Sequence, residues 1–356
     1  MYLAIKEMKH AKLRYSLIMF MIVLISYLIF VLTGLAYGLS ESNRQAIDSW
    51  QADAIVLNSD ADSHLSQSVI TKNQLAKLKS DDRLAQLGEL GVTARDPKGH
   101  KKVSSELLGI SKNQFIYQQL TTISGRKFNS QHEAVVDKSM YDSGYRLGDE
   151  IYLSSDSPAY KIVGFTKDAK LSVAPVIYTS LSDWRDIKFG ATSDGQVSAV
   201  LLKKNQLNQK ADDLDQLTTE EFINKLPGYR AQNLTFGFMI AFLMLITLII
   251  IAIFLYILTM QKLPYFAVLK AQGISTKYLV KNTVGQSILV TVSGVLVGGG
   301  ITVLTAIGLP PAVPITFNYP LLAGAACLLV VMSVIGALIP ARTIVKVDPV
   351  SMIGGN

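Results

Sequence analysis

Three long stretches of this chain contain no charged side chain, and they constrain the fold more than any other feature. Residues 15–40, 231–261 and 282–341 lack Asp, Glu, Lys and Arg. A helix of roughly 20 apolar residues crosses a bilayer, so each of the first two stretches predicts one membrane span. The third is too long for one span, and its proline-rich middle, residues 308–320, cannot continue a helix. The sequence therefore predicts four transmembrane helices.

These spans divide the chain into segments with predicted locations. In order, they are a cytoplasmic amphipathic helix (1–15), span one (16–39), an extracytoplasmic domain (40–231), span two (232–260), two cytoplasmic coupling helices (261–282), span three (283–308), a short external loop (309–318), span four (319–340) and a cytoplasmic tail (341–356). Span one could instead be the core of a cleaved signal peptide, but it is long for one and a good cleavage site is missing. The first segment either lies on the inner leaflet or serves only as a positive topology signal.

Basic residues near the spans predict the orientation. Lys and Arg favour the cytoplasmic side of a membrane span, and residues 309–318 contain neither. The flanking basic residues are Lys6, Lys9, Lys12, Arg14, Lys262, Lys270, Lys277, Lys281, Arg342 and Lys346. We therefore expect a multi-pass protein of the bacterial cytoplasmic membrane with both termini in the cytoplasm. The net charge of +7 reflects this topology and does not indicate binding to nucleic acid.

Residues 40–231 have the composition of a soluble domain and combine strand and helix patterns. Strands or strand starts are expected at 52–58 and 133–140, a hairpin at 148–153 and 160–165, a helix at 71–87, and a strand leading into a helix at 174–184. Ser182 or Asp183 would cap that last helix. The predicted fold class is a membrane protein with four transmembrane α-helices and an α+β extracytoplasmic domain inserted between spans one and two.

The chain lacks the motifs that would indicate catalysis or metal binding. It has no G-x-x-x-x-G-K-[ST] phosphate loop, no G-x-S-x-G elbow and no H-E-x-x-H pair. Cys327 is the single cysteine, which excludes an intramolecular disulfide, and the spans carry no charge for an ion relay. We therefore expect that the chain has no catalytic site of its own and that a partner supplies any energy.

The segment PYFAVLKAQGISTKYL, residues 264–279, lies between spans two and three and reads as a helix-turn-helix. Pro264 suits the first turn of a helix, Gly273 its end, and Ser275 the cap of a second helix. Such an elbow on the cytoplasmic surface could present apolar side chains to a groove on a motor protein. The residues expected to make this contact are Phe266, Val268, Leu269, Lys270, Gly273 and Ser275.

This elbow resembles the coupling segment of the FtsX-like (MacB-type) ABC permeases, whose usual form is E-x-A-V-L-[KR]-A-x-G-[AM]-S-x-x-x-[IL]. The ending IPARTIVKVDPVSMI, residues 339–353, is similar to the closing motif of that family, and residues 133–165 are similar to its MacB-like external core domain. The first forty residues, which end in LTGLAYGL, resemble the haem-exporter (HrtB) and DevC-type branch. The resemblance covers essentially the whole chain.

The resemblance implies a homodimeric permease that works with two copies of a separate ATPase subunit, to which ATP and Mg²⁺ would bind. It also implies mechanotransmission, in which closure of the ATPase dimer moves the coupling helices and the external domains. Haem would be the exported cargo rather than a bound cofactor. Export of another amphipathic cargo, such as an antimicrobial peptide or a lipid, stays open. So does a non-transporting relay that regulates a cell-wall hydrolase, as FtsX does.

The outer halves of spans one and two carry residues that suit a porphyrin. Aromatic faces and thioethers pack well against a flat ring, and Tyr and Met are iron ligand types. The candidates are Tyr27, Phe30, Tyr37, Phe238, Met239, Phe242 and Met244. They are equally typical of lipid-facing or packing positions. We expect no metal site beyond a possible contact with haem iron.

Two G-x-x-x-G patterns predict close helix packing, because small residues let helix backbones approach each other. Gly34 and Gly38 form one pattern in span one, and Gly294 and Gly298 form the other in span three. We expect Gly34 and Gly38 to pack against a second copy of the chain.

Overall fold

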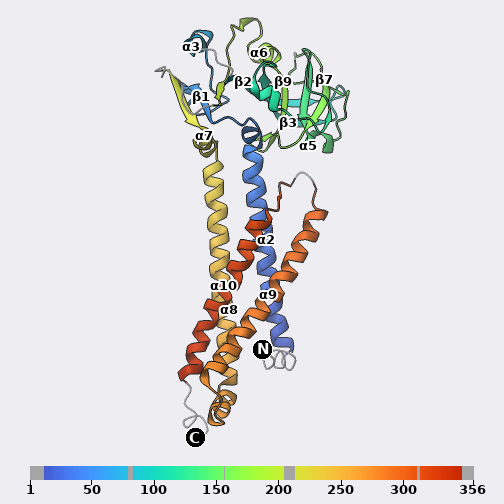
Figure 1. Cartoon of the computed structure of the whole chain (residues 1–356). Helices are drawn as coiled ribbons and strands as arrows, with labels where there is room; N and C mark the ends of the chain where they lie inside the picture. The colour runs from blue at the N-terminus through green and yellow to red at the C-terminus, as the bar shows by residue number, and fades with distance from the viewer. Residues whose placement is uncertain (1–11, 79–82, 156, 204–212, 311–312, 347–356) are drawn as a thin grey trace. The chain divides into compact units, whose positions relative to one another are not determined.

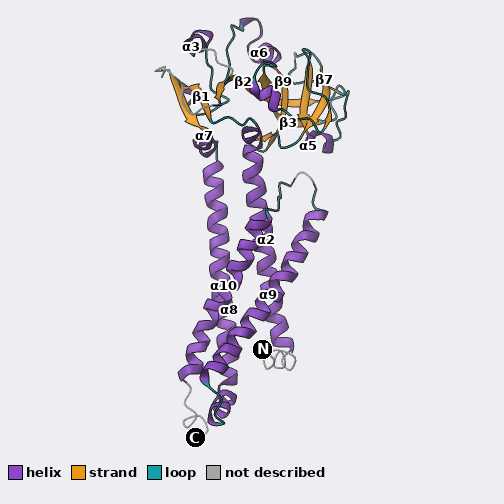
Figure 2. Cartoon of the chain, in the orientation of Figure 1, coloured by secondary structure: helices purple, strands orange, loops and turns teal. Residues whose placement is uncertain are grey.

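The computed structural model describes residues 12–78, 83–155, 157–203, 213–310 and 313–346. The chain forms two compact units. The helical unit comprises Met1–Gly38 and Leu234–Asn356, and the sheet domain comprises Leu39–Asn233. Figure 1 follows the chain through both units, and Figure 2 shows that the strands belong to the sheet domain.

Four helices in the described residues are long and apolar enough to cross a membrane. They are α2 (Lys12–Ser49), α8 (Tyr229–Ala271), α9 (Thr276–Gly308) and α10 (Tyr319–Lys346). Each is longer than its predicted span. The amphipathic helix predicted at 1–15 falls largely outside the described residues, and residues 12–15 are part of α2.

Glycines on α9 allow it to pack directly against α2. A Cβ at Gly294 would lie 2.6 Å from Ile22 Cγ2, and one at Gly298 would lie 2.2 Å from Ser26 Oγ. The Ser26 hydroxyl donates to Val23 O and lies 3.4 Å from Gly294 O. The G-x-x-x-G pattern of span three therefore serves a contact within the chain.

Two apolar clusters join all four helices of the helical unit. The first includes Ile22, Leu255, Val290 and Ala337, one from each helix. The second is Ile29, Phe30, Met244, Val295 and Leu329. Because lipid is as apolar as these side chains, van der Waals packing rather than the hydrophobic effect stabilises such contacts in a membrane.

The sheet domain is built on a mixed eleven-stranded sheet, whose central path has the order β11-β1-β10-β2-β3-β9-β5-β7-β4. The strands are β1 (Ala54–Asn58), β2 (Leu84–Arg95), β3 (Lys102–Ile110), β4 (Ser124–Gly125), β5 (Glu133–Asp137), β6 (Glu150–Ile151), β7 (Tyr160–Thr166), β8 (Lys170–Leu171), β9 (Ala174–Ser180), β10 (Ala199–Leu202) and β11 (Leu214–Thr218). Strand pairs β3–β9 and β5–β7 are parallel and the other pairs are antiparallel.

Short helices accompany the strands. They are η1 (Ser59–Ala61), α3 (Lys72–Lys77), α4 (Phe115–Gln119), α5 (Lys138–Asp142), α6 (Leu181–Phe189), η2 (Gly190–Thr192) and α7 (Thr219–Lys225).

Two apolar cores stabilise the sheet domain. One includes the last turn of α2, with Ile47 and Trp50, together with side chains from α4 and α7. The other contains Trp184 of α6. A Cβ at Gly88 of β2 would lie 2.1 Å from Trp184 Cδ2, and one at Gly109 of β3 would lie 2.4 Å from Trp184 Cβ. Trp184 therefore packs where the two strands carry no side chains.

Several sequence predictions for this domain need correction. The helix predicted at 71–87 ends at Lys77, and Leu84 already belongs to β2, because the pairing with β3 and β10 overrides the local helical pattern. The strand start predicted at 133–140 is confirmed as β5, which ends at Asp137, and helix α5 follows from Lys138. The N-cap of α6 is Ser180, whose side chain accepts from Asp183 N, rather than Ser182 or Asp183. The predicted hairpin forms between β6 and β7.

Candidate functional site

α8 ends at Ala271, and the turn that leads to α9 contains Gly273. Gly273 has φ +89°, a conformation that favours glycine, and Ile274 N donates to Leu269 O over 3.0 Å. Ser275 occupies the N-cap position of α9 but makes no side-chain capping hydrogen bond. The predicted helix end is therefore confirmed at Gly273.

The first coupling helix predicted from Pro264 is not a separate element. Pro264 lies inside α8, which continues from the membrane segment through the proline to Ala271. The preference of proline for the first turn of a helix therefore did not mark a helix start here. The turn therefore connects the ends of two long helices, so that a displacement of the turn would act on both directly.

Two residues predicted to contact a motor make contacts within the chain. Phe266 is only 2% exposed and forms a cluster with Leu279 of α9 and Ile344 of α10, against which Leu269 also packs. The Lys270 ammonium donates to Ile344 O at 2.9 Å and Val345 O at 3.2 Å. A cation on the last carbonyls of a helix is a favourable cap, so Lys270 ties the turn to the end of α10.

Other residues beside the turn are accessible. Val268 is 42% exposed, and Tyr265, Gly273, Ser275 and Tyr278 are also exposed. The surface that the turn presents therefore differs from the predicted one, with Tyr265 and Tyr278 accessible where Phe266 was expected.

The residues proposed to contact a porphyrin divide into two groups. Phe30 and Met244 are buried in one apolar cluster, so they pack the helices together. Tyr27 is half-buried, with its hydroxyl 3.3 Å from Thr305 Oγ1, and Tyr37 is also half-buried.

The second group lies on α8. Phe238, Met239 and Phe242 are 63%, 45% and 63% exposed. Phe238 and Phe242 are four residues apart and so lie one turn apart on the same side of the helix. An exposed aromatic surface with an adjacent thioether is therefore available on α8.

Gly34 and Gly38 are occupied by a contact within the chain. A Cβ at Gly38 would lie 2.2 Å from Pro314 O, and one at Gly34 would lie 3.3 Å from Phe317 Cε1. Thr316 N also donates to Gly34 O at 3.2 Å. The glycine pattern of span one thus accommodates the segment before α10, and packing of these two residues against a second copy stays a prediction.

A polar chain links three helices near the turn. The Lys262 ammonium of α8 lies 3.1 Å from the Tyr15 hydroxyl of α2, which donates to Gln286 Oε1 of α9 at 2.9 Å. Tyr15 and Gln286 are buried. Sequence reasoning missed this chain, because its three members come from separate parts of the sequence.

The sheet domain contains a second polar feature that the sequence did not indicate. Glu89 of β2 is 4% exposed. Glu106 of β3 pairs with Gly91, two residues along β2 from Glu89, so the two glutamates are diagonal neighbours in the sheet. Burial, followed by the hydrogen bond and charge of Glu106, raises the pKa of Glu89 from 4.5 to about 8, while Lys188 opposes the rise.

Glu41, on the last part of α2, also has a buried carboxylate oxygen, Oε2, with no hydrogen-bond partner. Among the described residues, no group of three or more His, Cys, Asp or Glu could hold a metal ion.

Comparison with known proteins identifies the helical region. Residues 237–349 match the sequence model of the FtsX-like permease C-terminal family. The chain is also 23% identical over 359 residues to a Staphylococcus haemolyticus protein assigned as hemin transport system permease protein HrtB, covering 100% of this chain and 99% of that protein. It is 24% identical to a protein of the same assignment from Staphylococcus epidermidis, and both chains are covered in full.

The chain carries an FtsX-like permease domain at residues 237–349. The permease is a protein of the cytoplasmic membrane. The permease is also similar to a solved structure of the extracellular domain of the noncanonic ABC-type transporter YknZ from Gram-positive bacteria. The match includes 44% of the permease and 83% of the solved chain, with 16% identity and a TM-score of 0.32.

Proposed function

We propose that the permease exports haem from the membrane, driven by a separate ATPase subunit. The observation that carries this proposal is the end-to-end match with proteins assigned to hemin transport, in which neither chain has a large unmatched part. The family assignment supports an ATPase partner, because a permease of an ABC transporter works with one. We propose two ATPase copies acting on a homodimer of the permease, with both chain termini in the cytoplasm.

The exposed side of α8 is our proposed contact for haem. Phe238 and Phe242 offer ring faces that can stack on a porphyrin, and Met239 offers a sulfur that can reach its iron. Phe30 and Met244 are excluded from this role because the helices bury them against each other. A surface on a membrane helix also suits a cargo that enters from the lipid.

The turn between α8 and α9 is our proposed contact for the ATPase. Its exposed side chains include Val268, Tyr265 and Tyr278. The Phe266 cluster and the Lys270 cap join the turn to α9 and α10. A push on the turn would therefore be transmitted to three helices at once, which is what mechanotransmission requires.

A haemin titration tests the proposal. The permease and its ATPase are placed together in nanodiscs, and the Soret band and the rate of ATP hydrolysis are followed as haemin is added. We expect a saturable, red-shifted band and a changed ATPase rate. A flat response with normal hydrolysis would exclude haem and leave a peptide or lipid cargo, or a relay to a cell-wall hydrolase.

A pair of methionine variants locates the contact. Met239→Leu should weaken haemin binding or change the band. Met260→Leu should behave as the unchanged protein, since Met260 is an equally exposed methionine elsewhere on α8. Equal spectra for both variants would move the iron contact away from Met239.

A further inference from the structure

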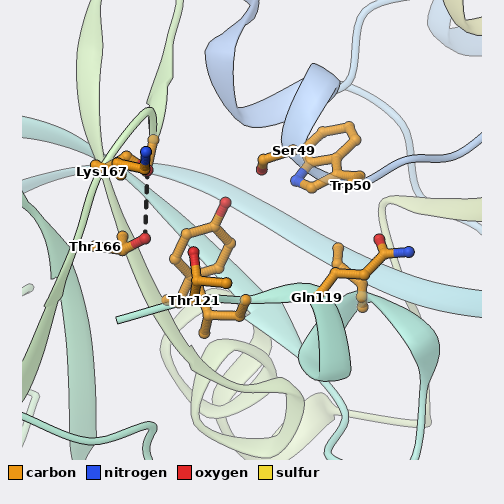
Figure 3. A pocket seen from close by; sticks show the side chains of 10 residues that line it. Ser49, Trp50, Gln119, Thr121, Thr166 and Lys167 are labelled. Atoms are coloured by element: carbon orange, nitrogen blue, oxygen red, sulfur yellow. Dashed lines mark hydrogen bonds between the residues drawn. The ribbon is translucent and has the colours of Figure 1, made fainter. Parts of the chain in front are cut away.

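The sheet domain contains a small polar pocket beside the last turn of α2. Ser49 reaches it from the end of α2, Trp50 from the residue that follows α2, Gln119 from α4, and Thr166 from the end of β7, as Figure 3 shows. Tyr178 of β9 also lines it. The pocket therefore lies where four elements of this domain meet.

Two of its lining residues have buried polar atoms that make no hydrogen bond of normal geometry. They are Trp50 Nε1, on a side chain that is 1% exposed, and Gln119 Oε1. The first is a donor and the second an acceptor. A buried polar group left without a partner is destabilising, so two of them beside one cavity call for a shared partner.

The cavity is large enough for such a partner. Its volume is about 30 Å³ as space open to the centre of a water molecule, whereas one buried water needs roughly 10 to 15 Å³ and two to four polar partners. The hydroxyls of Ser49 and Tyr178 supply further partners. Burial raises the pKa of Tyr178 to about 12, although the side chains of Ser49 and Trp50 lie close enough to its hydroxyl to oppose the rise, so this hydroxyl keeps its proton and can donate.

We propose that this pocket is a binding site for one or two ordered water molecules, which accept from Trp50 Nε1 and donate to Gln119 Oε1. The water joins the end of α2 to α4 within the sheet domain. The backbone supports this role, because Trp50 N donates to Ala46 O and Ile47 O and continues the last turn of α2. Gln119 is thus a positioning residue for Trp50.

The two tryptophans of the chain make the test internally controlled. Trp184 Nε1 is equally buried and also makes no hydrogen bond, but its ring packs directly against Gly88 and Gly109. The full chain, labelled with ¹⁵N at the indole nitrogens, is studied in nanodiscs by NMR, with Trp184→Phe and Trp50→Phe used to assign the two signals. We expect a cross-peak from water to the Trp50 indole N–H and a much weaker one to that of Trp184.

A Gln119 variant adds an independent readout. Gln119→Met keeps the length of the side chain but removes the acceptor, so the Trp50 indole signal should shift and its exchange with solvent should change, while the Trp184 signal stays in place. Absence of a water cross-peak at Trp50, or equal cross-peaks at both indoles, would overturn the proposal. So would a Trp50 signal that is unmoved in Gln119→Met.

Discussion

Replacing Glu89 with Gln should stabilise the sheet domain at neutral pH. Glu89 is buried beside Glu106, and these surroundings raise its pKa from 4.5 to about 8. The folded protein therefore retains a proton that the unfolded chain releases between these two pH values. The contribution of this group to the stability of the folded state is fully present below the pKa of the unfolded chain. It is lost as the pH rises through the pKa of the folded protein.

The change in the free energy of unfolding follows from the rise in the pKa of Glu89. One proton retained by the folded state changes the free energy of unfolding by about 1.4 kcal/mol per pH unit. Between pH 5.5 and 7.5, the unchanged protein should lose about 2 to 3 kcal/mol from this group. Glu89→Gln should remove that loss, because the neutral amide can donate to Glu106 at every pH in the range.

Tryptophan fluorescence measures this stability selectively. Both tryptophans, Trp50 and Trp184, lie in the sheet domain, so their emission during urea unfolding of the full chain in nanodiscs reports on that domain. Glu150→Gln is the matched control, since Glu150 is exposed. The reasoning is refuted if Glu89→Gln keeps the pH slope of the unchanged protein, or if it is less stable at pH 7.5.

Three further changes test other contacts. Gly88→Ala places a Cβ 2.1 Å from the Trp184 ring and should destabilise the sheet domain by about 1 to 3 kcal/mol in the same unfolding assay; unchanged stability would contradict the packing described. Gly273→Val puts a β-branched residue at φ +89° and should leave membrane insertion intact while ATP hydrolysis no longer drives export, whereas normal export would contradict the role of the turn. Tyr15→Phe and Gln286→Leu remove the two ends of one hydrogen bond, so a double-mutant cycle of unfolding in nanodiscs should show a coupling of about 0.6 kcal/mol, and additive effects would argue against it.

The membrane helices could be predicted from sequence because a bilayer imposes a strict requirement. A spanning segment must be long, apolar and free of charge, and residues 15–40 satisfy this without any knowledge of their neighbours. The separate helix predicted from Pro264 was wrong, because α8 continues through the proline to Ala271.

The candidate site was harder to predict because its contacts join distant parts of the chain. An apolar Phe266 beside a turn reads as a docking residue until Ile344 of α10 is known to cover it. The G-x-x-x-G pattern at Gly34 and Gly38 correctly indicates a close approach but cannot name the partner, which is the segment around Pro314.

The Glu89–Glu106 pair shows the same limit in the sheet. An acidic residue in a strand normally reads as solvent-facing, and only the register of β2 against β3 brings the two carboxyl groups together. Residues 71–87 were read as one helix because their helical pattern is local, whereas the pairing of β2 that ends it is not.

The most direct test of the central claim is transport itself. The permease and its ATPase are reconstituted in liposomes with the ATPase facing a lumen that contains haemin and either ATP or no nucleotide, and the Soret band of holomyoglobin is followed with apomyoglobin outside as the acceptor. The account predicts transfer that depends on ATP and falls in the Gly273→Val variant. Vigorous ATP hydrolysis with haem transfer no faster than without ATP would contradict it.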